Sequence, residues 1–416
     1  MDSDKAWHAS AVPYEVVDHM RLVVKFGGTS LGSGERIDRA ADSIAKAVDD
    51  GHEVAVVASA MGSTTDDLLE EINFEASPMD RAEIVSMGER TSVRMLKAAL
   101  SSRGLNAQFV EPGGDDWPII TDERGEVDAD VTKERAASLA DTLSTNVPVI
   151  TGFLAETADG QVTTLGRGGS DTSAVMLGNY MGADEVVIVT DVAGVMTGDP
   201  RVVEGARNVA KISVDELRSL SFRGAEVVAP SALSYKTGNL TVRVLHYQQG
   251  DLLSGGTRIE GEFRNLIDLR ERPVCCITIA GRAIRNQHGV LAKLANELAE
   301  HKINVEGVAS GMDSITFYVD EEESKRAETV LHGTVVSDEV LSSITLEGDI
   351  ATIRITGGEL PNRPGVIKSI VDPLSNANIQ IYDVITSATS ISLFVNWDDG
   401  EEALRVVQDL FDSVSH

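Results

Sequence analysis

Nearly continuous apolar runs, rather than alternating ones, mark the strands expected in the first part of the chain. Helix-like patterns, in which apolar residues recur every three or four positions, separate these runs. A strand that is apolar at every position is buried on both faces, which is typical of a mostly parallel sheet covered by helices on each side. The expected strands are 22–26, 54–58, 147–151 and 185–190, and the expected helices are 37–48, 80–99 and 132–143.

The pattern changes after about residue 268, where one order of elements occurs twice. Each copy reads strand, helix, strand, strand, helix, which predicts an internal repeat of small sheets with helices on one face. Asn304, after the first helix of the first copy, is matched with Asn378 in the second. The chain ends after the last helix, so the final strand of the second copy must be absent or supplied from elsewhere in the chain. The expected elements are 274–280, 291–300, 305–309, 315–319 and 321–331 in the first copy, and 350–356, 366–374, 379–385, 391–395 and 401–411 in the second.

Charge narrows the possible partners. The 416 residues include 66 acidic and 36 basic ones, for a formal net charge of −30, with 25 Arg and 11 Lys. Such a charge disfavours nucleic acid and anionic membranes as partners. Because the acidic residues are spread along the whole chain, the charge is a property of the whole surface. It fits either an enzyme adapted to a salty cytoplasm, where screening removes self-repulsion, or simply an acidic mesophilic enzyme.

The ends and the cysteines indicate a cytoplasmic protein. No apolar run approaches the length needed to cross a bilayer, and the acidic segment 1–20 resembles neither a secretory nor an organellar signal. We expect this segment to be a poorly ordered extension. Cys275 and Cys276 are neighbours in an expected strand, where small sheet residues in a reducing compartment are favoured over a disulfide or a metal site.

The most informative stretch is Gly166-Arg167-Gly168-Gly169-Ser170-Asp171-Thr172-Ser173-Ala174. It follows a hairpin signal at 158–160 and leads into an apolar helix expected to begin near Ala174. Glycines allow the backbone to turn several N–H groups towards one point, and a helix N-terminus adds partial positive charge. Arg167 adds a planar guanidinium suited to carboxylate or phosphate. The alternative is a plain glycine-rich helix cap, but the other polar loops favour an anion-binding site.

Two further loops follow apolar strands. The first places a lysine beside a glycine turn, in Lys25-Phe26-Gly27-Gly28-Thr29-Ser30. Backbone N–H groups there can hold phosphate oxygens and the lysine can neutralise charge, which is enough to position a phosphoryl group. It is not a Walker A loop, and a plain strand-to-helix turn is the alternative. Thr190-Asp191 to Asp199-Pro200-Arg201 offers carboxylates for ribose or adenine groups and an arginine for phosphate. Ligands of parallel sheets bind at the carboxyl ends of the strands, where all these loops fall.

Taken together, these loops resemble those of the aspartate kinases in the amino-acid-kinase family. The resemblance covers nearly the whole chain after Met20, and its motifs occur in the family's order. It implies a three-layer αβα kinase domain at 21–268, followed by two ferredoxin-like ACT domains at 272–342 and 343–416. The residues that carry it are 25–30, Ser59 to Gly62 with Thr65-Asp66, Gly88-Glu89-Arg90, Gly152-Phe153, 166–174, Thr190-Asp191, Asp199 to Arg201 and the tandem repeat.

The resemblance implies transfer of the γ-phosphoryl group of ATP to the side-chain carboxylate of L-aspartate. Lys25, Asp171 and Arg167 are the implied catalytic residues, with Asp171 near a Mg²⁺ ion that ATP carries. Glu89 suits the substrate ammonium, and Arg167 suits a carboxylate. The implied aspartate site comprises Ser59, Thr65, Glu89, Phe153, Arg167, Gly169 and Ser170. The implied nucleotide site comprises Lys25, Gly27, Gly28, Ser30, Thr190, Asp191, Met196, Asp199 and Arg201.

The sequence departs from the family at three positions. Met196 stands where an aromatic residue is usual, which weakens any stacking on the nucleotide. In the run 222–230, Glu226 replaces the usual lysine and Ala229 the usual histidine. A lysine turned to glutamate reverses the local charge, so we expect no nucleotide role for this run, and Arg223 is a possible substitute.

ACT domains are amino-acid-sensing modules, and the resemblance implies feedback by lysine or threonine and a homo-oligomer, dimer or tetramer, formed through them. The candidate effector residues are Gly289, Val290, Asn304, Gly365, Val366 and Asn378. A purely structural dimerisation module is the alternative. For the whole chain, two other functions compete with aspartate kinase: a kinase for another carboxylate, such as glutamate or N-acetylglutamate, and an amino-acid-binding regulator without kinase activity.

Overall fold

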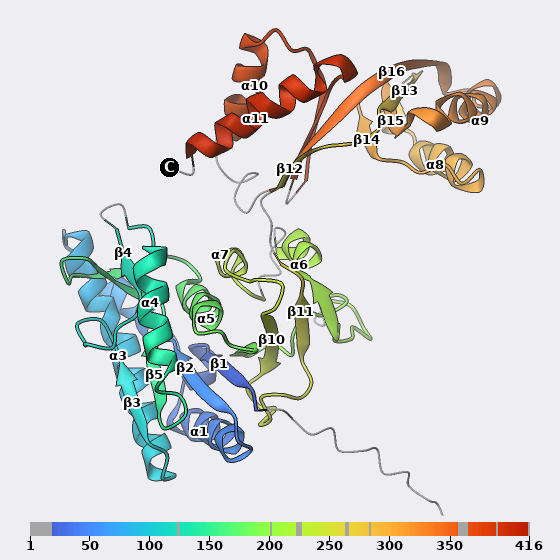
Figure 1. Ribbon diagram of the computed structural model, residues 1–416. Coiled ribbons are helices and arrows are strands. Elements are labelled where there is room, and N and C mark those ends of the chain that lie inside the picture. Colours follow the sequence, from blue (N-terminus) through green and yellow to red (C-terminus); the bar gives the residue numbers. More distant parts are fainter. Residues whose placement is uncertain are drawn as a thin grey trace, which may run out of the picture. The chain divides into compact units, whose positions relative to one another are not determined.

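The computed structural model describes residues 19–122, 125–199, 202–221, 227–262, 266–282, 284–356, 365–387 and 390–414. The chain divides into two compact units, Met1–Phe263 and Arg264–His416. Figure 1 draws the first in blue to yellow and the second in yellow to red.

An eight-stranded sheet forms the centre of the first unit, in the order β3-β5-β2-β1-β8-β10-β11-β9. The strands from β3 to β10 pair in parallel, β10 and β11 pair antiparallel, and β11 and β9 pair in parallel. The four expected strands are confirmed as β1, β2, β5 and β8. The bounds are β1 Arg21–Phe26, β2 Glu53–Ala58, β3 Ala107–Val110, β5 Val147–Thr151, β8 Glu185–Thr190, β9 Lys211–Ser213, β10 Thr241–His246 and β11 Thr257–Glu260.

Helices cover both faces of this sheet (Figure 1), which confirms the three-layer αβα prediction. One core cluster joins the sheet to α4, α5, α6 and α7, and a second joins it to α1 and α3. Successive strand residues alternate between the clusters; Val23 belongs to the first and Val24 to the second. The helices are α1 Gly34–Asp49, α2 Thr64–Glu71, α3 Pro78–Ser102, α4 Ala129–Ala140, α5 Gly169–Tyr180, α6 Val214–Ser221 and α7 Pro230–Leu233.

A small second sheet, in the order β4-β6-β7, lies in the first unit and contains the expected hairpin. Its strands are β4 Ile120–Thr121, β6 Leu154–Thr157 and β7 Val162–Thr164. Between β5 and β6 the chain turns at Phe153, which has a φ of 67°. A non-glycine residue in this region costs about 1 kcal/mol or more, and such residues gather at binding sites.

The second unit is built on one continuous sheet in the order β14-β15-β13-β16-β18-β17, with β12 also paired to β16. The long strand β16 serves both copies of the repeat: its first half pairs with β13 and its second half with β18. The elements are β12 Leu266–Leu269, β13 Val274–Gly281, α8 Val290–Glu300, β14 Gly307–Ser310, β15 Ser314–Asp320, α9 Ser324–Ser337, β16 Leu341–Thr356, α10 Val366–Asn376, β17 Ile381–Thr386, β18 Ser390–Asn396 and α11 Gly400–Val414.

The missing final strand of the second copy is supplied by β12. This strand pairs antiparallel with 353–356 of β16, so it completes a four-stranded sheet in the order β12-β16-β18-β17. The first copy has the equivalent order β16-β13-β15-β14. Both copies therefore have the ferredoxin-like arrangement that the family resemblance implied. Strand β12, which belongs to the sheet of the second copy, therefore precedes all strands of the first copy in the sequence.

The predicted match of Asn304 with Asn378 is wrong by two residues. Lys302 and Asn378 are the equivalent positions, because each has a φ of 57° directly after its helix. The next residues, Ile303 and Ile379, donate their N–H groups to Leu298 and Leu374 in the same way. The match rested on the shared asparagine, whereas the helix end requires only a residue that tolerates the left-handed conformation.

Three core clusters hold the second unit together. One lies under α8 and α9, one under α10 and α11, and a small one joins the two copies. In the small cluster Tyr318 stacks on Phe394 with ring centroids 3.8 Å apart and donates to Asp383. Cys275 is buried in β13, and burial raises the pKa of its thiol to about 12.

Among the described residues, no helix is long and apolar enough to span a membrane.

Candidate active site

A cavity of about 690 Å³ opens at the carboxyl ends of the parallel strands in the first unit. Its wall comes from the end of β1, the segment after β2, helices α2 and α3, and the glycine-rich segment before α5. The cavity brings together all of the predicted aspartate site and part of the predicted phosphate site. The predicted residues that line it are Lys25, Gly28, Ser59, Thr65, Glu89, Phe153, Arg167, Gly169, Ser170 and Asp171.

Lys25 and Asp171 form an ion pair at the floor of this cavity. The Lys25 Nζ and Asp171 Oδ1 atoms are 2.7 Å apart, and the two side chains are 12% and 15% exposed. The second oxygen of Asp171 accepts the backbone N–H of Ala229 at 3.1 Å. Lys25 comes from the end of β1 and Asp171 from the first turn of α5, so the pair joins the two loops that the sequence singled out.

Close backbone contacts explain the glycines around this pair. Gly168, the N-cap of α5, has a φ of 73°, and a Cβ there would lie 2.3 Å from the Ala229 Cβ. A Cβ on Gly28 would lie 2.8 Å from the carbonyl oxygens of Ala60 and Gly62. Helix α5 begins at Gly169, earlier than the predicted start near Ala174, because the left-handed Gly168 ends the preceding turn. The N-cap Gly168 makes no side-chain cap hydrogen bond, which leaves the first turn suited to an anion.

Glu89 is the buried carboxylate of the site. Its side chain belongs to α3 and is held by weak contacts, with Oε1 accepting from the Ala60 N–H at 3.3 Å and the Thr65 hydroxyl at 3.4 Å. Its Oε2 atom is buried without a hydrogen-bond partner among the described residues. Burial raises the pKa of Glu89 to about 7. A cationic ligand in the cavity would satisfy the free oxygen and favour the charged form.

Two arginines face the same cavity. Arg167 is exposed, lies between Gly166 and Gly168, and makes no ion pair with any other described residue. Arg81 of α3 was not predicted, yet it also lines the cavity and has no ion-pair partner in the described part of the chain. A signal for it existed in the sequence, because Arg81, Val85 and Glu89 follow one face of a helix at i, i+4 and i+8.

The predicted nucleotide residues lie at neighbouring strand ends, mostly outside this cavity. Ser30 is buried, and its hydroxyl donates to the carbonyl of Val189 at 3.0 Å, so it links the loop after β1 to β8. The Thr190 hydroxyl donates to Asp191 at 3.2 Å, and Asp191 and Asp199 are exposed. Met196 is half-buried, and Gly27 donates its N–H to Val189. Arg201, Arg223 and Glu226 lie outside the described residues.

A cavity of similar size, about 720 Å³, lies at the opposite edge of the sheet. It opens between the amino ends of the central strands and the ends of the helices that precede them. Arg21 lines this cavity and is neutralised by Glu53 at 2.9 Å. The described residues of its wall include neither a glycine-rich helix start nor a lysine, so the cavity at the carboxyl ends is the better catalytic candidate.

In the second unit, Gly289 and Gly365 occupy equivalent places. Each has a positive φ, 86° and 93°, and is the N-cap of a helix without a side-chain cap. Val290 and Val366 begin these helices. The amide of Asn304 donates to Glu306 at 3.0 Å. Two of the candidate effector positions, Asn304 and Asn378, are therefore not equivalent in the repeat, as noted above.

Comparison with known proteins agrees with this architecture. Residues 20–246 match the amino acid kinase family, and residues 277–335 and 345–409 each match an ACT domain. Aspartokinase 2 of Bacillus subtilis is 34% identical over 95% of this chain and 98% of its own, and the aspartokinase of Corynebacterium glutamicum is 32% identical over 94% and 96%. The crystal structure of the aspartate kinase from Synechocystis superposes with a TM-score of 0.80 at 26% identity, over 94% of this chain and 69% of that one. The chain therefore belongs to the amino acid kinase family and, within it, to the aspartokinases with two ACT domains.

Proposed function

We infer that the chain is an aspartate kinase, which uses ATP to phosphorylate the side-chain carboxylate of L-aspartate and yields 4-phospho-L-aspartate and ADP. The observation that carries this inference is the single cavity shared by Lys25, Glu89, Arg167 and Asp171. One basic and one acidic recognition group lie there beside a phosphate-binding helix start. The names of the relatives support the same activity.

The chemistry fits a site without a general base. The nucleophile is a carboxylate with an ordinary pKa of about 3.9, so it is already ionised at neutral pH. One of its oxygens attacks the γ-phosphorus while the bond to the β–γ bridging oxygen breaks, and ADP leaves. The protein then needs to position two anions and to neutralise their charge. We assign the second task to Lys25, which Asp171 holds in place at 2.7 Å.

Substrate recognition follows from the charges in the cavity. We propose that Glu89 binds the α-ammonium group of aspartate through its unpartnered oxygen and that Arg167 binds the α-carboxylate. Ser59, Thr65, Phe153, Gly169 and Ser170 complete this site. We assign the nucleotide to Gly27, Gly28, Ser30, Thr190, Asp191, Met196, Asp199 and Arg201.

Mg²⁺ would be brought by the ATP phosphates. Mg²⁺ commonly takes one or two carboxylates from the protein and the rest of its ligands from phosphate and water. Asp171, which lies beside Lys25 in the cavity, is the carboxylate suited to this mode. Bound Mg²⁺ would neutralise charge on the β- and γ-phosphates.

We also propose that the reaction is the first step of lysine, threonine and methionine biosynthesis and that an amino acid, lysine or threonine, inhibits it through the ACT domains. The helix starts at Gly289 and Gly365 support such a site, because these N-cap glycines make no side-chain cap hydrogen bond and the N–H groups of the first turn suit a carboxylate. Assembly into a dimer or tetramer through the ACT domains belongs to the same proposal. Titrating lysine, threonine and methionine into the assay identifies the effector.

ADP release with L-aspartate, L-glutamate and N-acetylglutamate tests the function. We expect turnover with aspartate well above that with the other two, in Mg²⁺ and at both low and high KCl. A preference for glutamate would replace the assigned substrate. Binding of an amino acid without any ADP release would make the chain a regulator instead.

Two variants test the roles within the cavity. Lys25→Ala should lower kcat about 100-fold or more with little change in the KM for aspartate, because the lysine acts mainly on the transferring phosphoryl group. Arg167→Ala should raise the KM for aspartate about tenfold or more, the loss of a charged hydrogen bond of about 1.5–3 kcal/mol. Lys133→Ala and Arg258→Ala, at exposed positions that do not line the cavity, are the controls. Unchanged kinetics in both cavity variants would refute these roles.

A further inference from the structure

His246, at the carboxyl end of β10, lies on the same face of the sheet as Lys25. Residues paired in register on neighbouring parallel strands lie on the same face of the sheet. His246 is paired with Thr190 of β8, and Lys25 of β1 is paired with Ile188 of β8. Ile188 and Val244 belong to the core cluster that faces α5 and α7. Since residues two apart in a strand share a face, the Cα–Cβ bonds of Lys25, Thr190 and His246 leave the sheet on the α5 side. The His246 ring then turns along the strand end, where it meets Tyr247 and Gln248.

The loop that follows Thr190 crosses the end of β10 on this same face. Val195 of the loop is buried in the α5-facing cluster, and its N–H donates to the Thr257 hydroxyl at 2.8 Å. Thr257, in β11, is the register partner of Val244 in β10. The loop to which the nucleotide is assigned is therefore anchored to β11, the strand next to β10. Its anchor, Thr257, is opposite Val244, which precedes His246 by two residues.

One ring nitrogen of His246 accepts a backbone hydrogen bond, and the other is left as a donor. Its Nδ1 accepts the backbone N–H of Gln248 at 3.2 Å, so the neutral ring carries its proton on Nε2. The ring lies 4.6 Å from the ring of Tyr247, which in turn lies under the guanidinium of Arg36 at 4.6 Å. His246 is half-buried, and no described residue accepts a hydrogen bond from its Nε2. A donor fixed in this way and left without an acceptor is suited to a ligand oxygen.

We propose that His246 binds the nucleotide, with its Nε2–H donating to a ribose or phosphate oxygen that ATP and ADP share. The proposal rests on the kinase function inferred above and adds a residue to it. The strand order gives the reason for nucleotide rather than aspartate: the aspartate cavity lies over β1 and α3, whereas β10 lies on the other side of β8. His246 does not line the aspartate cavity.

Steady-state kinetics with separate titrations of ATP and aspartate test this contact. His246→Ala should raise the KM for ATP about three- to tenfold, as expected for one hydrogen bond to a neutral donor, and leave the KM for aspartate and kcat within about twofold. His246→Gln should restore the KM for ATP to near the wild-type value, because the glutamine Nε2 can donate from a similar place. His332→Ala, at an exposed position of α9, is the control for loss of a histidine.

Titration of ADP into the wild-type protein and both variants gives a readout that does not depend on turnover. The dissociation constant should rise in His246→Ala by the same factor as the KM for ATP. An active wild-type enzyme whose His246→Ala variant keeps both values would overturn the proposal. Equal rises in both KM values, or no rescue by glutamine, would make His246 a structural residue and overturn it too. A wild-type protein without aspartate kinase activity would instead overturn the function.

Discussion

Glu89 makes substrate binding sensitive to pH at the scale of one carboxylate. Burial raises its pKa to about 7, so in the empty cavity near neutral pH a large share of Glu89 is protonated and uncharged. A protonated Glu89 cannot pair with the aspartate ammonium. A bound ammonium would lower this pKa again, because an opposite charge favours the ionised form.

We therefore expect kcat/KM for aspartate, measured at saturating ATP, to fall as the pH drops below about 7, approaching tenfold per pH unit. The value of kcat should fall much less, since it reports the complex in which Glu89 stays ionised. Glu89→Gln should have a raised KM for aspartate at every pH, and its kcat/KM should not show this fall below pH 7. A kcat/KM that stays flat from pH 8 to pH 5.5 would contradict the assignment of Glu89 to the ammonium.

A second arginine, Arg81, lines the cavity beside Arg167, and neither forms an ion pair with another described residue. A chain with a net charge of −30 repels anionic substrates at long range, and a local cation counters that repulsion. Arg81→Ala should raise the KM for aspartate about two- to fivefold at low salt, and less at 1 M KCl, where the Debye length is about 3 Å. Arg258→Ala is the control. An effect that does not change with salt would mean a direct contact instead of long-range attraction.

At the scale of elements, the apolar pattern predicted those helices and strands that depend on their own residues. Strands β1, β2, β5 and β8 were predicted because each is apolar at most positions and buried on both faces. The start of α5 was predicted too late, because Ser170 and Asp171 read as loop residues while the left-handed Gly168 sets the boundary. The four-residue strand β12 had no local signal at all. Its identity depends on a partner strand far along the chain.

The candidate site was predictable for a similar reason. Lys25, Glu89, Arg167 and Asp171 come from four separate segments, but parallel strands place their carboxyl ends at one edge, so the loops there converge. The sequence could not give what depends on packing. Two examples are the hydrogen bond from Ser30 to the Val189 carbonyl and the Glu89 Oε2 atom, which has no hydrogen-bond partner among the described residues.

Strand β12 also supplies a prediction about the second ACT domain. Ile267 packs against the core under α10 and α11, whereas its neighbour Leu266 is 49% exposed. Ile267→Asp should lower the free energy of unfolding of this domain by about 1–3 kcal/mol, because a charge would be placed against an apolar core. Leu266→Asp should change it by less than about 0.5 kcal/mol.

Hydrogen exchange distinguishes the two variants. In Ile267→Asp, faster exchange is expected in β18, α10 and α11, with α8 and α9 much less affected, since the two copies have separate cores. Equal protection of α10 and α11 in the two variants would show that β12 does not complete the second domain in solution.

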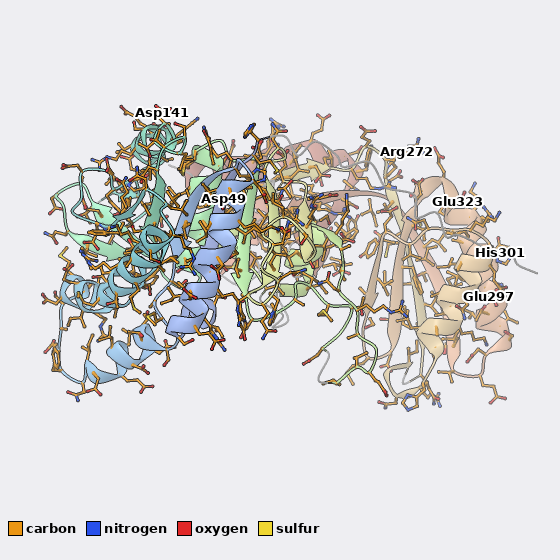
Figure 2. All side chains as sticks on the ribbon, turned by 90° about the horizontal axis from the view of Figure 1, so that it is seen from below. Asp49, Asp141, Arg272, Glu297, His301 and Glu323 are labelled. Atoms are coloured by element: carbon orange, nitrogen blue, oxygen red, sulfur yellow. The ribbon has the colours of Figure 1, made fainter. Side chains whose placement is uncertain are left out.

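At the scale of the whole molecule, two effects of salt oppose each other. Salt weakens exposed ion pairs such as Arg39–Glu35 and Lys211–Glu260, each worth about 0–1 kcal/mol. Salt also weakens repulsion among the carboxylates. With 66 acidic and 36 basic residues, at least 30 of the acidic side chains have no basic side chain to pair with one to one. Exposed acids such as Asp49 and Asp141, labelled in Figure 2, belong to this excess-charge surface.

Because repulsion involves many more charges than the exposed pairs, we expect it to decide the sign. The melting temperature should rise as KCl increases from about 10 mM to 1 M, a range in which the Debye length falls from about 30 Å to 3 Å. Most of the rise should occur below about 0.3 M if screening is the cause, since repulsion over more than a Debye length is lost first. Sucrose at matched osmolality is the control, because it strengthens apolar burial by exclusion without screening charge. A melting temperature that is flat or falls with KCl would show that the surface charge is tolerated without added salt, and would remove the case for adaptation to a salty cytoplasm.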